Sequence, residues 1–371
     1  MEEHRIRVLV VFGTRPEAIK MAPIVKTLEA APDIEPIVCV TGQHEEMLAQ
    51  VLKAFDIVPH IELKVMREAQ TLYGLTARLI ESLEPVMKAE KYDLVLVHGD
   101  TSTAFSAALC AYYAQIPIGH VEAGLRTYDK YAPFPEEMNR EFIGRVADLH
   151  FAPTTTAAKR LASEHRKEHV YVTGNTSIDA LRWTIKKEFD HPLLSKLHPG
   201  TRKIFMTMHR RENWGSPMKQ VFQAVREIIE QDRTLELIYP VHPNPAVKDL
   251  AFEMLGGTER IHLIEPLDVS DMHNMMNHAY VILTDSGGIQ EEAPSLGKPV
   301  LVLRDKTERP EGVKAGTLRC VGTEYEKVKK EIELLLSGGK RYQRMTRAAN
   351  PYGDGHASDR IASIILKYFA D

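Results

Sequence analysis

The sequence predicts an α/β protein with two Rossmann-like, doubly wound lobes that face a central cleft, and two observations support this fold class. Short, almost wholly apolar segments rich in β-branched residues recur along the chain, and each stops at a polar turn that leads into a segment with helical spacing. Repeated strand–turn–helix units of this kind specify a parallel sheet that helices cover on both faces. The chain also has 371 residues, which is too long for one hydrophobic core, so two lobes of ordinary size are expected.

The first lobe is expected over residues 1–174. Its first strand, 6–12, leads into a turn in which Pro16 suits the first position of a helix. A polar, aromatic and proline-bearing segment, 127–139, is expected to be a binding loop, and a helix is expected to begin at Arg140. The strands expected in this lobe are 6–12, 35–40, 92–97, 117–121, 148–151 and 169–173.

The second lobe is expected over residues 175–355 and repeats the plan of the first after a hinge at 174–176. The chain then ends in an apolar-striped helix, and residues 356–371 are expected to pack back onto the first lobe. The strands expected in the second lobe are 203–208, 235–241, 260–264, 280–283, 299–303 and 318–321.

Composition excludes several classes of protein. A hydrophobic content of 44% with 26% charged residues is typical of a soluble globular protein, and a net charge of −4 argues against a nucleic-acid or membrane surface as the main partner. Cys39, Cys110 and Cys320 stand far apart in apolar contexts, so we expect buried thiols and no disulfide framework. The N-terminus has no signal-peptide pattern and no apolar stretch of about 18 residues follows, so a cytoplasmic protein is expected.

The stretch 281–292 is an apolar run that stops at Asp-Ser-Gly-Gly and restarts as a polar, helix-like segment. Unpaired N–H groups at a helix start, next to glycines without a Cβ, can cradle a phosphate. An ordinary strand-to-helix turn also uses small and polar residues, so the pattern alone leaves both interpretations open.

The turns after the expected strands separate by charge. Because ligands of open parallel sheets bind beyond the carboxyl ends of the strands, these turns should line one cleft. The first lobe presents carboxylates together with two cations: Asp100, Glu122, Glu136, Arg15 and Lys20. The second lobe presents groups suited to an anion: His209, Arg210, Ser286, Gly287, Gly288 and Arg309. This sorting predicts acid/base chemistry on one side of the cleft and an anion clamp on the other.

Other motifs do not support a cofactor or a metal. The turn after the first strand lacks G-x-G-x-x-G, and no Walker A sequence occurs, so neither a dinucleotide nor a P-loop site is predicted. The H-x-x-E-H pattern at 165–169 is strongly charged and leads into a strand, which is typical of a solvated helix end. The many histidines suggest a metal hypothesis, but their spacing fixes no ligand set.

Several stretches together resemble one family. They are 13–20 (Gly-Thr-Arg-Pro-Glu-Ala-Ile-Lys), 98–100 (His-Gly-Asp), 120–126 (His-Val-Glu-Ala-Gly-Leu-Arg), 135–137 (Pro-Glu-Glu), 209–213 (His-Arg-Arg-Glu-Asn), 284–292 and 308–310 (Glu-Arg-Pro). In this order they resemble the bacterial non-hydrolysing UDP-N-acetylglucosamine 2-epimerases, over nearly the whole chain. The resemblance implies a fold of the glycosyltransferase-B type, usually a homodimer. It also implies interconversion of UDP-N-acetylglucosamine and UDP-N-acetylmannosamine for cell-envelope polysaccharides, without cofactor or metal.

The resemblance also implies roles for individual residues. Asp100, Glu122 and Glu136 would form the acid/base set. The diphosphate would be held by His209, Arg15, Ser286, Gly287 and Gly288. Glu292 would bind the ribose hydroxyls, Arg309 and Lys20 the polar end of the sugar or phosphate, and the turn at Leu267 and Met272 the uracil.

Many bacterial members of this family resemble one another in a second, allosteric UDP-N-acetylglucosamine site. The matching positions here are Gln43, Gln70, Glu136, Arg210 and His242. Glu46 and Ala69 stand where the family pattern has an amide and an arginine. The loss of a cation should weaken an anion site.

Charge sorting and resemblance lead to one mechanism. A carboxylate removes the C2 proton of the sugar while the basic wall stabilises the departing UDP, which leaves a 2-acetamidoglucal. Protonation from the opposite face as UDP re-adds then inverts C2, so two proton-handling groups are required. The alternatives are a hydrolysing epimerase and a glycosyltransferase of the same fold. A metal-dependent hydrolase and a nucleotide-sugar sensor are more distant.

Overall fold

The computed structural model describes residues 5–42, 45–67 and 70–370. The chain divides into two compact units. Unit 1 runs to Trp183 and resumes at Gly353, and unit 2 is Thr184–Tyr352. Helix α7 (Thr176–Thr184) spans the boundary, so the hinge expected at 174–176 lies at the beginning of this helix.

Unit 1 contains a seven-stranded parallel sheet with the strand order β3-β2-β1-β4-β5-β6-β7. Its strands are β1 (Ile6–Phe12), β2 (Ile34–Val40), β3 (Ile61–Glu62), β4 (Leu94–His98), β5 (Ile118–Val121), β6 (Leu149–Ala152) and β7 (Val170–Val172). Its helices besides α7 are α1 (Arg15–Glu29), α2 (Glu45–Ala54), α3 (Leu72–Ala89), α4 (Ser102–Tyr113), α5 (Glu136–Val146), α6 (Thr155–Ser163) and α15 (Ala357–Ala370).

Local sequence accounts for the first strand–helix unit. Strand β1 is buried from Val8 to Phe12, as its apolar composition requires. Helix α1 then begins with a capping box, in which Thr14 and Glu17 satisfy each other's backbone N–H groups. Helix α15 packs against α1, and Ala357 and Ser358 at its start donate backbone hydrogen bonds to the buried Asp179.

Several elements of unit 1 differ from the sequence expectation, among them the short strand β3 and helix α7, which were not predicted. Helix α3 lies in a segment for which no element was predicted, although Leu75, Leu79 and Leu83 form a buried stripe at helical spacing. Helix α5 begins at Glu136 and not at Arg140, so the loop before it is shorter than expected.

Unit 2 contains a six-stranded parallel sheet with the strand order β10-β9-β8-β11-β12-β13. Its strands are β8 (Arg202–Thr207), β9 (Leu235–Pro240), β10 (Ile261–Ile264), β11 (Val281–Thr284), β12 (Val300–Val302) and β13 (Leu318–Cys320). Its α-helices are α8 (Ser216–Gln231), α9 (Pro245–Leu255), α10 (Val269–His278), α11 (Gly287–Glu292), α12 (Pro310–Ala315), α13 (Tyr325–Leu336) and α14 (Lys340–Arg347).

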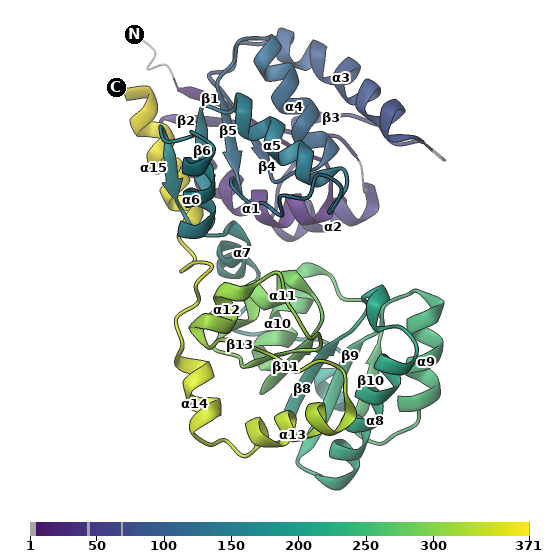
Figure 1. Cartoon of the computed structure of the whole chain (residues 1–371). Helices are drawn as coiled ribbons and strands as arrows, with labels where there is room; N and C mark the ends of the chain where they lie inside the picture. The colour runs from purple at the N-terminus through teal and green to yellow at the C-terminus, as the bar shows by residue number, and fades with distance from the viewer. Residues whose placement is uncertain (1–4, 43–44, 68–69, 371) are drawn as a thin grey trace. The chain divides into compact units, whose positions relative to one another are not determined.

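Alternate residues of the unit 2 strands face two separate cores. Ile204 and Met206 pack with residues of α8, α9 and α13, whereas Phe205 packs with residues of α10 and α11. Figure 1 shows these two groups of helices on opposite sides of the sheet. Both faces of the sheet are therefore buried, and the predicted fold class of two doubly wound parallel α/β sheets is confirmed.

The three cysteines are free thiols. Cys39 and Cys110 are buried as expected, and burial raises the pKa of Cys39 to about 12. The expectation of a buried Cys320 is wrong, because this residue lies at the end of the edge strand β13 and is partly exposed. Within the described residues, no helix is both long and apolar enough to span a lipid bilayer.

Candidate active site

Each sheet has a switch point from which the chain winds in opposite directions. The neighbours at this point are β1 and β4 in unit 1, and β8 and β11 in unit 2. Ligands of open α/β sheets bind beyond the carboxyl ends of such strands. Arg15 and Asp100 follow the first pair, and His209 and Ser286 follow the second. These four sequence-predicted residues therefore lie beside the two switch points.

Asp100 is paired with a cation that the sequence analysis did not identify. Its Oδ2 lies 2.6 Å from Nη2 of Arg140, and its backbone carbonyl accepts a 2.9 Å hydrogen bond from Asn139 Nδ2. Burial raises the pKa of Asp100 to about 6, an effect that Arg140 opposes and that Glu122 and Glu136 reinforce. Asp100 can therefore change protonation state close to neutral pH.

Glu122 lies beside Lys20 and His98. Its Oε2 accepts a hydrogen bond from Lys20 Nζ and lies 3.7 Å from His98 Nε2. The residue has a left-handed backbone with φ of 64°. Gly99, with the same φ, follows β4, and a Cβ on it would lie 3.8 Å from Glu122 Oε1. These contacts bring together Glu122 and Lys20, which the sequence analysis assigned to one site.

Two buried histidines of unit 1, His98 and His120, remain neutral near pH 7. Burial lowers the pKa of His98 to about 4 and that of His120 to about 3. His120 Nε2 donates to the backbone carbonyl of Gly99 at 2.7 Å. In residues 5–42, 45–67 and 70–370, no three His, Cys, Asp or Glu side chains are grouped as metal ligands.

Helix α5 carries the third predicted carboxylate in its first turn. Glu136 is partly exposed, and the neighbouring Glu137 is fully buried. Oε1 of Glu137 accepts 2.8 Å hydrogen bonds from the backbone N–H groups of Thr127 and Tyr128, while its Oε2 lies 3.4 Å from Arg140 Nη1. Glu137 thus anchors the preceding loop and leaves Glu136 as the accessible carboxylate.

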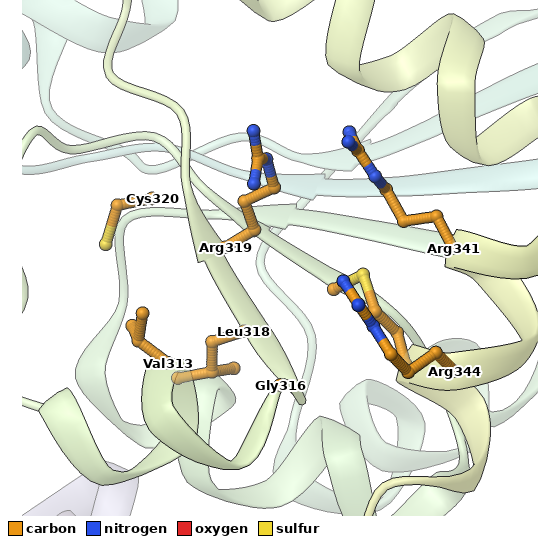
Figure 2. Close-up of a pocket in the computed structure, with 8 residues that line it drawn as sticks. Val313, Gly316, Leu318, Arg319, Cys320, Arg341 and Arg344 are labelled. Carbon is orange, nitrogen blue, oxygen red and sulfur yellow. The ribbon is translucent and has the colours of Figure 1, made fainter.

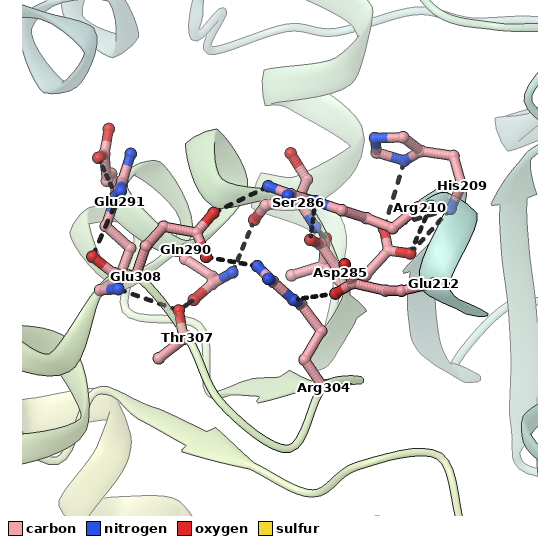
Figure 3. A network of polar contacts seen from close by, with 12 residues as sticks. His209, Arg210, Glu212, Asp285, Ser286, Gln290, Glu291, Arg304, Thr307 and Glu308 are labelled. Carbon is pink, nitrogen blue, oxygen red and sulfur yellow. Dashed lines mark hydrogen bonds and ion pairs between the residues drawn. The ribbon is translucent and has the colours of Figure 1, made fainter. Parts of the chain in front are cut away.

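In unit 2 the buried Asp285 organises the turns after β8 and β11 (Figure 3). Its carboxylate accepts hydrogen bonds from the backbone N–H groups of His209 and Arg210, at 3.0 and 2.9 Å, and from Asn213 Nδ2 at 2.9 Å. Arg210 Nε donates in turn to the backbone carbonyl of Asp285 at 3.2 Å. One carboxylate therefore joins the predicted anion-binding residues of the two turns.

The space above Gly287 is bordered by charged groups. A Cβ on Gly287 would lie 3.6 Å from Arg309 Nη2, 3.8 Å from Arg210 Nη2 and 3.4 Å from Glu308 Oε1. Ser286 N donates to Thr284 Oγ1 at 3.0 Å, and a Cβ on Gly288 would lie 3.8 Å from Glu292 Oε1. Two of the predicted anion-binding arginines thus converge on the glycine turn.

His209 is not a permanent cation. Burial lowers the pKa of His209, and the nearby His242 and Arg210 lower this pKa further. Asp285, whose Oδ1 lies 3.3 Å from His209 Nδ1, raises the pKa but does not outweigh these effects. The His242 ring stacks on that of His209, with centroids 5.5 Å apart and an interplanar angle of 12°. The anion site is therefore charged mainly by its arginines.

The remaining predicted contacts of unit 2 lie near α10. Glu292 Oε2 lies 3.3 Å from Nε2 of the buried His273. Leu267 is buried, and the partly buried Met272 packs with it in the core shared by α10 and α11. Little of either side chain is available to a ligand, so only backbone contacts are expected from these two residues.

The predicted allosteric residues are distributed over both units. Gln43 lies outside the described residues, as does Ala69. Gln70 Oε1 accepts hydrogen bonds from Arg78 Nη2 and from the backbone N–H of Arg67. Arg210 and His242 belong to the unit 2 turns described above.

A separate hollow of about 230 Å³ lies among α12, β13 and α14 (Figure 2). Arg319 and Arg341 at this hollow donate to Glu331, at 2.8 and 2.7 Å. The residues that line it are Val313, Gly316, Leu318, Arg319, Cys320, Arg341, Arg344 and Met345. None of them belongs to the predicted active site.

Sequence reasoning missed Arg140 and the bridging role of Asp285. A signal for Arg140 was present, because Glu136, Asn139 and Arg140 stand at positions i, i+3 and i+4 and share one helix face. The late helix start predicted at Arg140 concealed this spacing. No local signal marks Asp285, whose partners come from another strand.

Two parallel α/β units, with Asp100 beside one switch point and Arg210 beside the other, define a two-lobed protein of the glycosyltransferase-B type. A family model described as UDP-N-acetylglucosamine 2-epimerase matches residues 26–366. The chain therefore belongs to the UDP-N-acetylglucosamine 2-epimerase family, and the resemblance inferred from the sequence is confirmed.

Individual relatives agree with this family. The UDP-N-acetylglucosamine 2-epimerase of Bacillus subtilis (strain 168) is 51% identical over 366 residues, which cover 98% of this chain and 96% of that protein. A crystal structure from Listeria monocytogenes matches with a TM-score of 0.94 and 52% identity, over 99% of this chain and 97% of the other. UDP-GlcNAc 2-epimerase from Neisseria meningitidis, solved bound to UDP-GlcNAc, matches with a TM-score of 0.86 and 44% identity, over 98% of this chain and all of the other.

Proposed function

We propose that this enzyme, an isomerase, interconverts UDP-N-acetylglucosamine and UDP-N-acetylmannosamine through elimination and re-addition of UDP. Family membership and the relative solved with UDP-GlcNAc support the substrate. The observation that carries the mechanism is the raised pKa of Asp100, about 6, at the switch point of a unit that also presents Glu122 and Glu136. A carboxyl group with this pKa can both accept and return a proton near neutral pH.

Unit 2 would hold UDP throughout the reaction. Arg210 and Arg309 converge at Gly287, and Arg guanidinium groups bind phosphate oxygens in a fixed, forked geometry. His209, Ser286 and Gly288 stand in the same two turns. Glu292 would bind the ribose hydroxyls, and the backbone at Leu267 and Met272 would bind the uracil. Stabilising the diphosphate as its bond to C1 breaks is the electrostatic part of catalysis.

Unit 1 would handle the protons. The C2 proton leaves to one carboxylate, the C1–O bond to UDP breaks, and a 2-acetamidoglucal forms. When UDP adds back at C1, a second carboxyl group protonates C2 from the other face. Asp100, Glu122 and Glu136 are the groups for these steps, and Glu122 forms an ion pair with Lys20. Arg15, one turn before Lys20 on α1, would contact the diphosphate.

The test of this function follows the hydrogen at C2. We expect UDP-N-acetylglucosamine incubated with the enzyme in D2O to give UDP-N-acetylmannosamine with deuterium at C2, because the proton passes through an exchangeable carboxyl group. NMR of the C2 position measures both product and label. Free N-acetylmannosamine as the product would indicate a hydrolysing enzyme, and unchanged substrate with no label would contradict the proposal.

Replacing Arg140 by Gln should move one limb of the pH–rate profile to higher pH. Arg140 lowers the pKa of Asp100 against the effect of burial, so its removal lets that pKa rise above about 6. The pH dependence of kcat/KM gives the pKa values of the essential groups in the free enzyme. The limb that moves is the acidic one if Asp100 must be ionised in the direction of epimerisation that is measured. It is the alkaline limb if Asp100 must be protonated in that direction. The profile therefore also assigns Asp100 to one face of C2.

The matched control is Arg145→Gln, which removes an exposed arginine from the same helix. This variant should keep the wild-type profile. A limb near pH 6 that stays in place in Arg140→Gln would show that Asp100 is not the titrating group.

We propose further, from the family pattern, a homodimer whose product supplies cell-envelope polysaccharide synthesis. A second UDP-N-acetylglucosamine site that uses Gln43, Gln70, Glu136, Arg210 and His242 belongs to the same proposal.

A further inference from the structure

Glu308 holds two arginines at the anion site. Its Oε1 accepts a 2.8 Å hydrogen bond from Arg210 Nη2, and its Oε2 accepts a 2.5 Å hydrogen bond from Arg304 Nη1 (Figure 3). The side chain is 40% exposed, so it can turn toward water without breaking the core.

The Glu308 carboxylate lies beside the glycine turn that is predicted to bind the diphosphate. Its Oε1 is 3.4 Å from the Cβ position of Gly287, the position that Arg309 Nη2 and Arg210 Nη2 approach to 3.6 and 3.8 Å. No side chain of residue 287 separates the carboxylate from these guanidinium groups. Glu308 thus presents a negatively charged oxygen at the point where the two arginines converge.

Each guanidinium group of this cluster already has a carboxylate partner. Arg210 is paired with Glu308, Arg304 with Glu212 as well as Glu308, and Arg309 with Glu291. A diphosphate that binds Arg210 Nη2 therefore competes with the carboxylate of Glu308. Glu291 is buried, whereas Glu308 is accessible and bridges two arginines, so Glu308 is the group to be displaced.

Glu308 is ionised in this position. Burial would raise its pKa, but a hydrogen bond from its own backbone N–H and the charges of Arg210 and Arg304 outweigh burial and lower it. The carboxylate consequently competes as an anion at every pH at which the enzyme would work.

We propose that Glu308 is an internal competitor of the UDP diphosphate: it occupies Nη2 of Arg210 in the unliganded enzyme and thereby limits the affinity for UDP. This inference rests on the proposed function of unit 2 as the UDP site. Because one anion replaces another, the arginines have a negatively charged partner both before and after UDP binds. UDP-sugar can then leave after each turnover, although the site holds UDP strongly enough for re-addition.

The experiment compares UDP binding to the wild-type enzyme and to Glu308→Gln by isothermal titration calorimetry. Glutamine keeps the size of the side chain but not its charge, so we expect Kd for UDP to fall about tenfold, with slower dissociation in stopped-flow displacement. Glu308→Ala, which removes both oxygens, should shift Kd in the same direction. Circular dichroism and the melting temperature establish that each variant is folded.

The control is Asp305→Asn, which removes the same single charge from an exposed position in the same loop. It should change Kd by less than about twofold. Weaker or unchanged binding of UDP to both Glu308 variants, in an enzyme whose wild type binds UDP and epimerises its sugar, would overturn the inference and leave the proposed function intact. A wild-type enzyme that binds no UDP would overturn both.

Discussion

Replacement of Asp100 by Asn is expected to lower kcat by about 10²- to 10⁴-fold, the range typical of a positioned general acid or base. The amide cannot accept the C2 proton or return it. The affinity for UDP should change by less than about threefold, because Asp100 is not one of the proposed diphosphate ligands. Asparagine keeps the shape of the side chain, and the 2.9 Å hydrogen bond from Asn139 to the backbone carbonyl of residue 100 does not depend on the carboxylate.

This prediction is measured with initial rates of epimerisation in both directions and with calorimetry of UDP. Asp33→Asn, at an exposed position before β2, is the control and should retain wild-type kcat. Equal losses of turnover and UDP binding in Asp100→Asn would show that this residue supports the structure and does not carry a proton.

Replacement of Asp285 by Ala is expected to lower the free energy of unfolding by about 3–5 kcal/mol, the range found when one partner of a buried charged network is removed. The buried carboxylate accepts hydrogen bonds from the backbone N–H groups of His209 and Arg210 and from Asn213 Nδ2. Alanine leaves the two backbone N–H groups without an acceptor, whereas Asn213 Nδ2 keeps its 3.3 Å hydrogen bond to the backbone carbonyl of Leu303. The two turns lose their common anchor, and UDP affinity should fall at least about tenfold.

Urea unfolding measures the loss of stability, and hydrogen exchange of the β8 and β11 amides localises it to unit 2. Asp268→Ala is the matched control. Asp268 also accepts a backbone hydrogen bond, from Asp271 N at 2.8 Å, but it is an exposed helix N-cap whose loss costs about 1 kcal/mol. A loss for Asp285→Ala no larger than that for Asp268→Ala would contradict the anchoring role.

Most of the fold could be predicted because its signals are local. The segments 8–12 and 281–283 are apolar on both faces of a strand, and this composition is itself the mark of a central parallel strand. The chemistry of Thr14, Pro16 and Glu17 likewise marks the start of α1 without any distant contact. Helix α3 was missed although its apolar stripe and its N-cap Thr71 are local signals, since Pro85 lies inside the helix.

The candidate site was predicted as a set of residues but not as a set of pairs. The turn positions of Asp100, Glu122, His209 and Ser286 followed from the alternation of strands and helices alone. The hydrogen-bond and ion-pair partners of these residues could not be predicted from that alternation. The Glu308–Arg210 bond joins residues 98 positions apart, and the bond from Arg210 N to Asp285 spans 75 positions.

The sequence by itself determined the alternating α/β plan, the family and the charge of each switch point, because strand burial, turn chemistry and motif order are properties of neighbouring residues. Only the tertiary structure decided which charges are paired. The parallel order of the strands places β8 beside β11 and so joins His209 and Arg210 to Asp285. Burial at the carboxyl end of β4 similarly raises the pKa of Asp100. The free energy of a charge depends on the solvent and partners around it, and these are present only when distant segments pack together.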